Sequence, residues 1–68
     1  MNLSIEIDQE NDGRWLAEII DLPGVMVYGA ARDAALSAVK ALALRTLADK
    51  IESGEIQPDL TEISFVIT

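Results

Sequence analysis

The 68-residue sequence contains neither cysteine nor histidine. Without these residues the chain cannot form disulfides, zinc sites with thiolate or imidazole ligands, thiol nucleophiles or imidazole acid–base pairs. Hard cations held by carboxylate oxygens are the metal chemistry that the composition leaves open. The residue inventory therefore predicts a protein without a cofactor and favours one without enzymatic activity.

Basic residues are scarce as well, because five Lys and Arg face twelve Asp and Glu, for a net charge of −7. A surface of this sign repels nucleic-acid phosphates and anionic lipid headgroups. No apolar run approaches the roughly 20 residues that cross a bilayer, and the first residues lack the basic start of a signal peptide. We therefore expect a cytoplasmic protein that binds neither nucleic acid nor membrane and favours a basic protein partner.

The chain is short, yet half of its residues are apolar. This is enough for one hydrophobic core, so we expect residues 1–68 to form a single domain. A domain of this size buries about 60% of the surface that its unfolded chain exposes. Small domains often compensate through disulfides or self-association. Since disulfides are excluded here, we expect a homo-oligomer, either a dimer or a tetramer.

Alternation of apolar and polar residues predicts the strands. Leu3 to Ile7 forms one strand with a single apolar face, and Arg14 to Ile20 forms a second with large residues on both faces. The Asp-Gly pair at 12–13 between them predicts a hairpin. Val25 to Tyr28 gives a short third strand, and Ile63 to Ile67 alternates as a closing strand.

The stretch from about Ala31 to Ser53 is rich in Ala, Leu, Arg and Lys and stops before Gly54, which predicts one long helix. Its large apolar residues cover about half of the helix circumference, more than contact with one sheet requires. They are Leu36, Val39, Leu42, Leu44, Leu47 and Ile51. The predicted fold is α+β with the order β-β-β-α-β. A helix packs on a three-stranded antiparallel sheet, and the closing strand lies parallel to its neighbour.

Three motifs, in this order and spacing, resemble the N-terminal domain of HicB-family antitoxins. They are the run Asn11 to Ala17 (NDGRWLA), the run Asp21 to Val25 (DLPGV), and Gly29 leading into the helix. The resemblance covers nearly the whole chain and implies a partial RNase H-like fold. It also implies a module of a type II toxin-antitoxin system that binds and neutralises a small basic ribonuclease toxin of the HicA type, and that assembles into dimers or larger oligomers.

Two features depart from the family pattern. The family usually places Thr or Ser at the helix N-cap, where this chain has Ala31, so a cap worth about 1 kcal/mol is missing. Asp33 in the first turn offsets part of this loss through the helix dipole. Complete HicB antitoxins continue into a DNA-binding segment, whereas this sequence reaches Thr68 with the closing strand. We therefore do not expect this sequence to bind an operator by itself.

Five acidic residues form the predicted toxin-binding site: Asp8, Glu10, Asp12, Glu18 and Asp21. Acids of this kind could instead hold magnesium ions in a nuclease, or serve the hairpin turn through side-chain hydrogen bonds. Glu18 is the most informative member, because alternation places it between Leu16 and Ile20 on the face opposite Trp15. If a partner covers that face, Glu18 should meet an Arg or Lys.

The residues predicted to contribute to the oligomer interface are Leu16, Ile20, Met26, Tyr28, Leu44 and Ile51. Trp15 is expected to anchor the core under or beside the helix, and Lys40 to extend from the rim of the apolar helix face. The rival hypothesis is an orphan self-assembling domain with no toxin partner and no catalytic activity, which would use the broad helix face and the closing strand for oligomer contacts.

Overall fold

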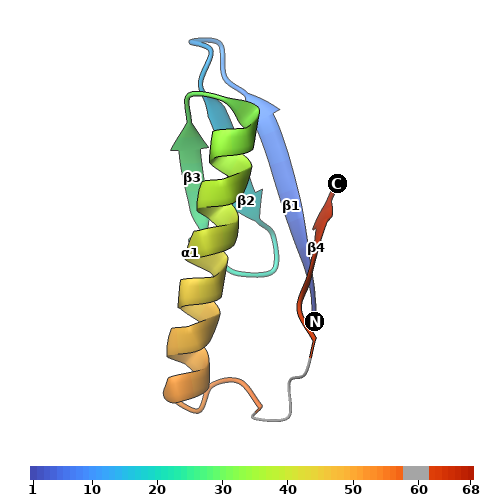
Figure 1. Cartoon of the computed structure of the whole chain (residues 1–68), viewed down its shortest axis with the longest axis vertical. Helices are drawn as coiled ribbons and strands as arrows, with labels where there is room; N and C mark the ends of the chain where they lie inside the picture. Colours follow the sequence, from blue (N-terminus) through green and yellow to red (C-terminus); the bar gives the residue numbers. More distant parts are fainter. Residues whose placement is uncertain (58–61) are drawn as a thin grey trace.

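The computed structural model describes residues 1–57 and 62–68. Their secondary structure consists of β1 (Asn2–Gln9), β2 (Trp15–Ile19), β3 (Met26–Gly29), α1 (Arg32–Glu52) and β4 (Ser64–Ile67). The helix runs along one face of a four-stranded sheet (Figure 1). This confirms the predicted α+β fold and element order, with ends that shift by one or two residues. The pattern Glu55 to Leu60, which contains Pro58, predicts a short loop, and this segment lies partly outside the described residues.

The sheet has the strand order β3-β2-β1-β4. β1 and β3 run antiparallel to β2, while β4 runs parallel to β1 and pairs Phe65 with Leu3. A parallel neighbour cannot be reached by a tight turn, so the chain crosses back through the long helix. β3 and β4 are therefore the two edges of the sheet, and the acidic β1–β2 hairpin occupies its centre.

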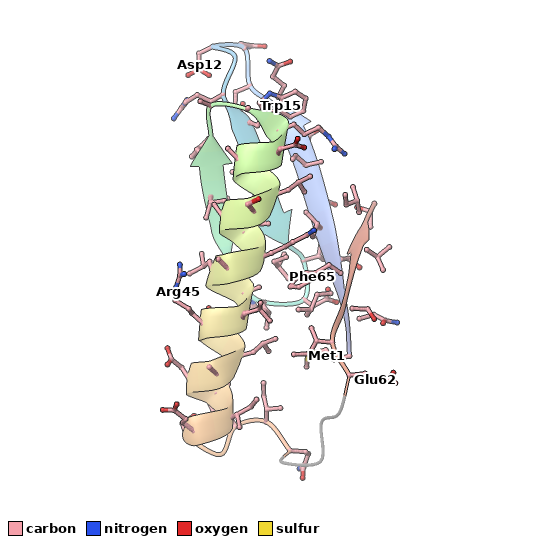
Figure 2. All side chains as sticks on the ribbon, viewed as in Figure 1. Met1, Asp12, Trp15, Arg45, Glu62 and Phe65 are labelled. Atoms are coloured by element: carbon pink, nitrogen blue, oxygen red, sulfur yellow. The ribbon has the colours of Figure 1, made fainter. Side chains whose placement is uncertain are left out.

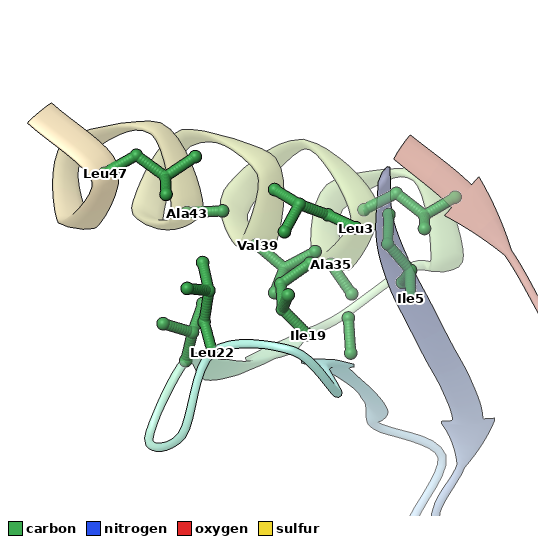
Figure 3. Packing of buried hydrophobic residues seen from close by; sticks show 11 residues of the cluster. Leu3, Ile5, Ile19, Leu22, Ala35, Val39, Ala43 and Leu47 are labelled. Atoms are coloured by element: carbon green, nitrogen blue, oxygen red, sulfur yellow. The ribbon is translucent and has the colours of Figure 1, made fainter. Parts of the chain in front are cut away.

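The core lies between the sheet and the helix. Leu3 and Ile5 of β1 and Ile19 of β2 are fully buried, as the alternation predicted. Figure 3 shows these side chains directed toward Val39 and Leu47 of the helix. Each such large side chain contributes roughly 1.5–3 kcal/mol when it is fully buried. The complete buried set is Leu3, Ile5, Ala17, Ile19, Leu22, Val25, Ala35, Leu36, Val39, Ala43 and Leu47.

The helix meets the sheet through small residues that the pattern of large residues did not identify. Ala35 and Ala43 are fully buried, whereas Leu44 and Ile51 are exposed. A Cβ atom placed on Gly29 would lie 2.6 Å from the backbone nitrogen of Ala35 and 2.9 Å from its Cα. The last residue of β3 is therefore in backbone contact with the first turn of the helix, which requires glycine at this position.

The helix begins and ends where the sequence predicted. Ala31 is the N-cap and makes no side-chain hydrogen bond to the helix, while Asp33 supplies the acidic residue of the first turn. Ser53 is the C-cap, and Gly54 follows with a φ of +80°. Within the described residues no helix has the length and apolarity needed to span a membrane.

Trp15 and Lys40 occupy the rim of the core. The half-buried Trp15 packs against the buried cluster near the hairpin end of the sheet (Figure 2). The Lys40 ammonium lies 5.9 Å from the centre of the Phe65 ring, within cation–π range, so this side chain reaches from the helix toward β4. Both positions agree with the roles predicted for these residues.

Replacing Gly29 with alanine should lower the free energy of unfolding by about 1–3 kcal/mol, because the added Cβ collides with helix backbone that cannot rotate away. Urea denaturation monitored by circular dichroism measures the change. The matched background is Ala35→Gly, which removes a neighbouring Cβ but leaves the clashing backbone atoms in place. An unchanged midpoint, or full rescue by Ala35→Gly, would show that the contact does not constrain the fold.

Candidate functional site

The sheet face opposite the helix carries the candidate site, which we call the outer face. Alternation along the strands directs every second side chain to this side, away from the buried residues. Its members come from all four strands and from the residue after β2. They are Glu6, Asp8, Leu16, Glu18, Ile20, Met26, Tyr28 and Val66. The helix packs against the inner face, so no element of the described chain covers these side chains.

Two glutamates meet at the centre of the outer face. The β1–β2 register places Glu6 directly opposite Glu18, which puts their Cβ atoms about 5 Å apart. Glu6 is exposed and Glu18 is half-buried. Within the described residues neither carboxylate lies within salt-bridge distance of a Lys or Arg. Like charges opposite each other in a sheet destabilise it, so the free protein contains an uncompensated acidic pair.

Exposed apolar side chains surround this pair. The β2–β3 register pairs Glu18 with Met26 and Leu16 with Tyr28, and Ile20 follows at the end of β2, where its N–H donates to the carbonyl of Ser4. Ile20, Met26 and Tyr28 are each 45–50% exposed. Aromatic and methionine side chains are enriched at protein–protein interfaces. The outer face thus combines apolar contact area with unpaired negative charge.

Most of the negative charge of the protein lies in the segment that forms the first three strands. Residues 1–29 contain six carboxylates and a single arginine, so they carry −5 of the total charge of −7. The arginine, Arg14, is already engaged, because its Nε donates to an Asp12 oxygen at 2.8 Å and its guanidinium lies 4.3 Å from the centre of the Tyr28 ring. It therefore leaves the Glu6–Glu18 pair uncompensated.

Asp12 serves the hairpin turn. It accepts a hydrogen bond from the backbone N–H of Arg14 at 3.1 Å, and this bond, together with the Arg14 guanidinium, holds the pKa of the Asp12 carboxyl below its usual range. Gly13 has a φ of +91°, a conformation that the tight reversal requires and that side chains disfavour. Asp12 therefore makes the side-chain hydrogen bond in the hairpin turn that the sequence offered as one alternative.

The five acids predicted as the toxin site do not form one cluster. Asp8 and Glu18 share the outer face, whereas Glu10 and Asp12 lie in the β1–β2 loop. Asp21 follows β2, and its carboxylate accepts a hydrogen bond from the backbone N–H of Ser4 at 2.7 Å. This bond links β1 to the end of β2.

Glu6 was not among the predicted site residues. Alternation already directed it outward with Asp8, but its position opposite Glu18 depends on the hairpin register, which the sequence did not fix.

The predicted oligomer residues divide between two surfaces. Leu16, Ile20, Met26 and Tyr28 belong to the outer face, while Leu44 and Ile51 lie exposed on the helix. A two-fold symmetric contact between two copies uses the same surface of each copy, so it would involve one of these two surfaces. The outer-face members also surround Glu18, so the predicted toxin site and most of the predicted oligomer interface occupy the same area.

The surface is open. The described part of the chain contains no pocket, and it brings together no group of three or more His, Cys, Asp or Glu side chains that could hold a metal ion. In these residues the acids are therefore not arranged as the converging carboxylates of a two-metal nuclease. An open, partly apolar and acidic face is suited to contact with another macromolecule.

No family model matches this chain, and no curated protein or solved structure matches it either. The geometry, exposure and charge of the outer face are therefore the features that bear on function.

Neutralising one member of the central pair should stabilise the isolated protein. Glu18→Gln is expected to raise the free energy of unfolding by about 0.2–1 kcal/mol, because it removes the repulsion from Glu6. Urea denaturation at low salt measures the effect, and it should shrink at high salt as the charges are screened. Glu10→Gln, which makes the same change of net charge in the loop, is the control. If Glu18→Gln were no more stable than the wild type, the two carboxylates would not be in opposition.

Proposed function

We propose that this chain is an antitoxin module of the HicB type, which binds and neutralises a small basic ribonuclease toxin of the HicA type within a type II toxin-antitoxin system. The supporting observation is the Glu6–Glu18 pair on the outer face, which lies among exposed apolar side chains and has no cationic partner within residues 1–57 and 62–68. The motifs that resemble the HicB N-terminal domain support the choice of family, and the outer face supports the location of the binding surface.

The chemistry of such a partner explains why this face would recognise it. A ribonuclease must present basic side chains to the phosphates of RNA. A compact acidic surface can form ion pairs with those side chains and so prevent RNA from binding to them. A guanidinium placed against Glu6 and Glu18 would donate charge-assisted hydrogen bonds to both carboxylates and relieve their mutual repulsion. Binding would therefore remove an electrostatic cost that the free antitoxin carries.

The apolar residues around the pair would supply most of the area of the contact. Tyr28 offers a rigid aromatic surface, and Met26 and Ile20 can adapt to the shape of the toxin. Burial of these side chains would keep water away from the central ion pairs and strengthen them. The remaining acids of the hairpin would steer the basic toxin toward this face before contact. The proposed module acts by occlusion in the cytoplasm and performs no catalysis.

A second candidate function is an orphan domain that assembles with itself and has no toxin. The observation that favours it is the exposure of Leu44 and Ile51 on the helix, far from the acidic pair. This apolar surface is not needed for binding a basic toxin at the outer face.

Reversing one charge of the pair separates these functions. Glu18→Lys should leave the fold intact and weaken binding of the basic toxin by at least about a hundredfold, because attraction becomes repulsion at the centre of the contact. Glu52→Lys makes the same change of net charge on the exposed end of the helix and should retain binding. Isothermal titration calorimetry with the toxin, and recovery of its ribonuclease activity, are the two measurements.

The toxin would first be recovered by low-salt pull-down of the tagged protein from its source cells, followed by mass spectrometry. A stoichiometric basic ribonuclease that Glu52→Lys retains and Glu18→Lys loses supports the antitoxin function. Recovery of the tagged chain alone would favour the self-assembling domain. Equal loss of the ribonuclease by both variants would reduce the contact to general charge attraction and remove the outer face as the site.

A further inference from the structure

Five residues of α1 form an uncharged line on its solvent side, which we call the helix stripe. They are Ser37, Ala41, Leu44, Ala48 and Ile51. All five are exposed, and the two large ones are 47% and 43% exposed. Successive members lie four, three, four and three residues apart, which is the spacing that keeps side chains in line along one helix face and characterises helix-to-helix contacts.

The helix stripe is separate from the face that packs on the sheet. At 100° per residue its centre lies about 130° around the helix from the centre of the buried residues, which include Ala35, Val39 and Leu47. The sheet therefore cannot cover it. A surface helix with one apolar face would carry polar residues here, yet the two largest side chains of the stripe are Leu44 and Ile51.

We propose that the helix stripe is the contact surface for a second copy of this chain, with the two helices antiparallel. The sizes of its residues identify this occupant. In an antiparallel pair the 41 and 48 positions of one helix face the 37, 44 and 51 positions of the other. Leu44 of each copy then faces Ala41 or Ala48 of its partner, so each large side chain enters a space left by a small one. The stripe is complementary to itself.

Charge supports the occupant. Two copies that each carry −7 repel one another, so they can meet most easily where the surface has no charge. Two cations flank the stripe: Lys40 on the side of Phe65, and Arg45 on the opposite flank (Figure 2). Either orientation brings two of these cations together: Lys40 meets Arg45 in a parallel pair, and the two Arg45 side chains meet near the centre of an antiparallel pair. The sizes of the stripe residues therefore decide the orientation.

This arrangement places the two sheets outside and the two helices inside. The outer face of each copy stays accessible, so self-association and recognition of a basic partner use different surfaces of the molecule. The inference does not depend on the proposed antitoxin function. Of the residues predicted for the oligomer interface, the helix stripe includes Leu44 and Ile51, and the four outer-face residues remain an untested prediction.

The length of the stripe sets the strength of the contact. Residues 37 to 51 span about 21 Å at 1.5 Å per residue, which gives an area below that of a standard stable interface. We therefore expect a reversible dimer with a dissociation constant on the order of 10–100 μM.

Sedimentation equilibrium of the whole chain tests the surface. The wild type should be a monomer–dimer mixture over this concentration range, and Leu44→Glu should raise the dissociation constant at least about tenfold. Ile20→Glu is the matched control, because Ile20 is 49% exposed on the outer face and Leu44 is 47% exposed on the helix. It should leave dimerisation unchanged. A monomeric wild type at millimolar concentration, or a greater loss with Ile20→Glu, would overturn the proposal.

Single cysteines test the orientation, because the chain has none of its own. In the antiparallel dimer the two Ser37 positions lie far apart, so Ser37→Cys should not form a disulfide-linked dimer during brief mild oxidation. In a parallel dimer the same two positions would be adjacent and would link readily. Rapid dimer formation by Ser37→Cys would overturn the antiparallel arrangement even if Leu44→Glu abolished association.

Discussion

One helix cannot cover both faces of a sheet, and in this protein the contact between Gly29 and Ala35 holds the start of the helix close against one of them. The backbone of β3 and that of the first helical turn approach so closely that a Cβ on Gly29 would lie 2.6 Å from the Ala35 nitrogen. From there the helix runs over the inner face of the sheet and buries the aliphatic side chains of β1 and β2. The described residues of the chain leave the outer face uncovered.

Two surfaces of the described chain are therefore left uncovered, one on the sheet and one on the helix. On the outer face, the hairpin register brings Glu6 and Glu18 together among exposed apolar side chains. Such a surface is costly to the free protein and complementary to a cationic one. On the far side of the helix, the stripe that contains Leu44 and Ile51 is apolar and uncharged. We propose that the first surface binds a basic partner and that the second binds another copy.

Sequence patterns predicted the elements well because each has a local cause: alternation in the strands, Asp-Gly at the hairpin, and Gly54 after the helix. They did not predict Ala35 and Ala43 as core residues, because their burial depends on how closely the helix approaches the sheet rather than on their size. Glu6 was missed for a related reason. Its facing direction is local, but its neighbour is set by the register between strands.

Methyl NMR of the isotopically labelled protein tests the separation of the two surfaces most directly. When the basic partner is added at fixed protein concentration, the methyl signals of Ile20 and Met26 should shift while those of Leu44 and Ile51 stay in place. When the protein alone is concentrated, the pattern should reverse. Shifts of Leu44 and Ile51 on addition of the partner, with Ile20 and Met26 unmoved, would contradict the assignment of the outer face as the binding surface.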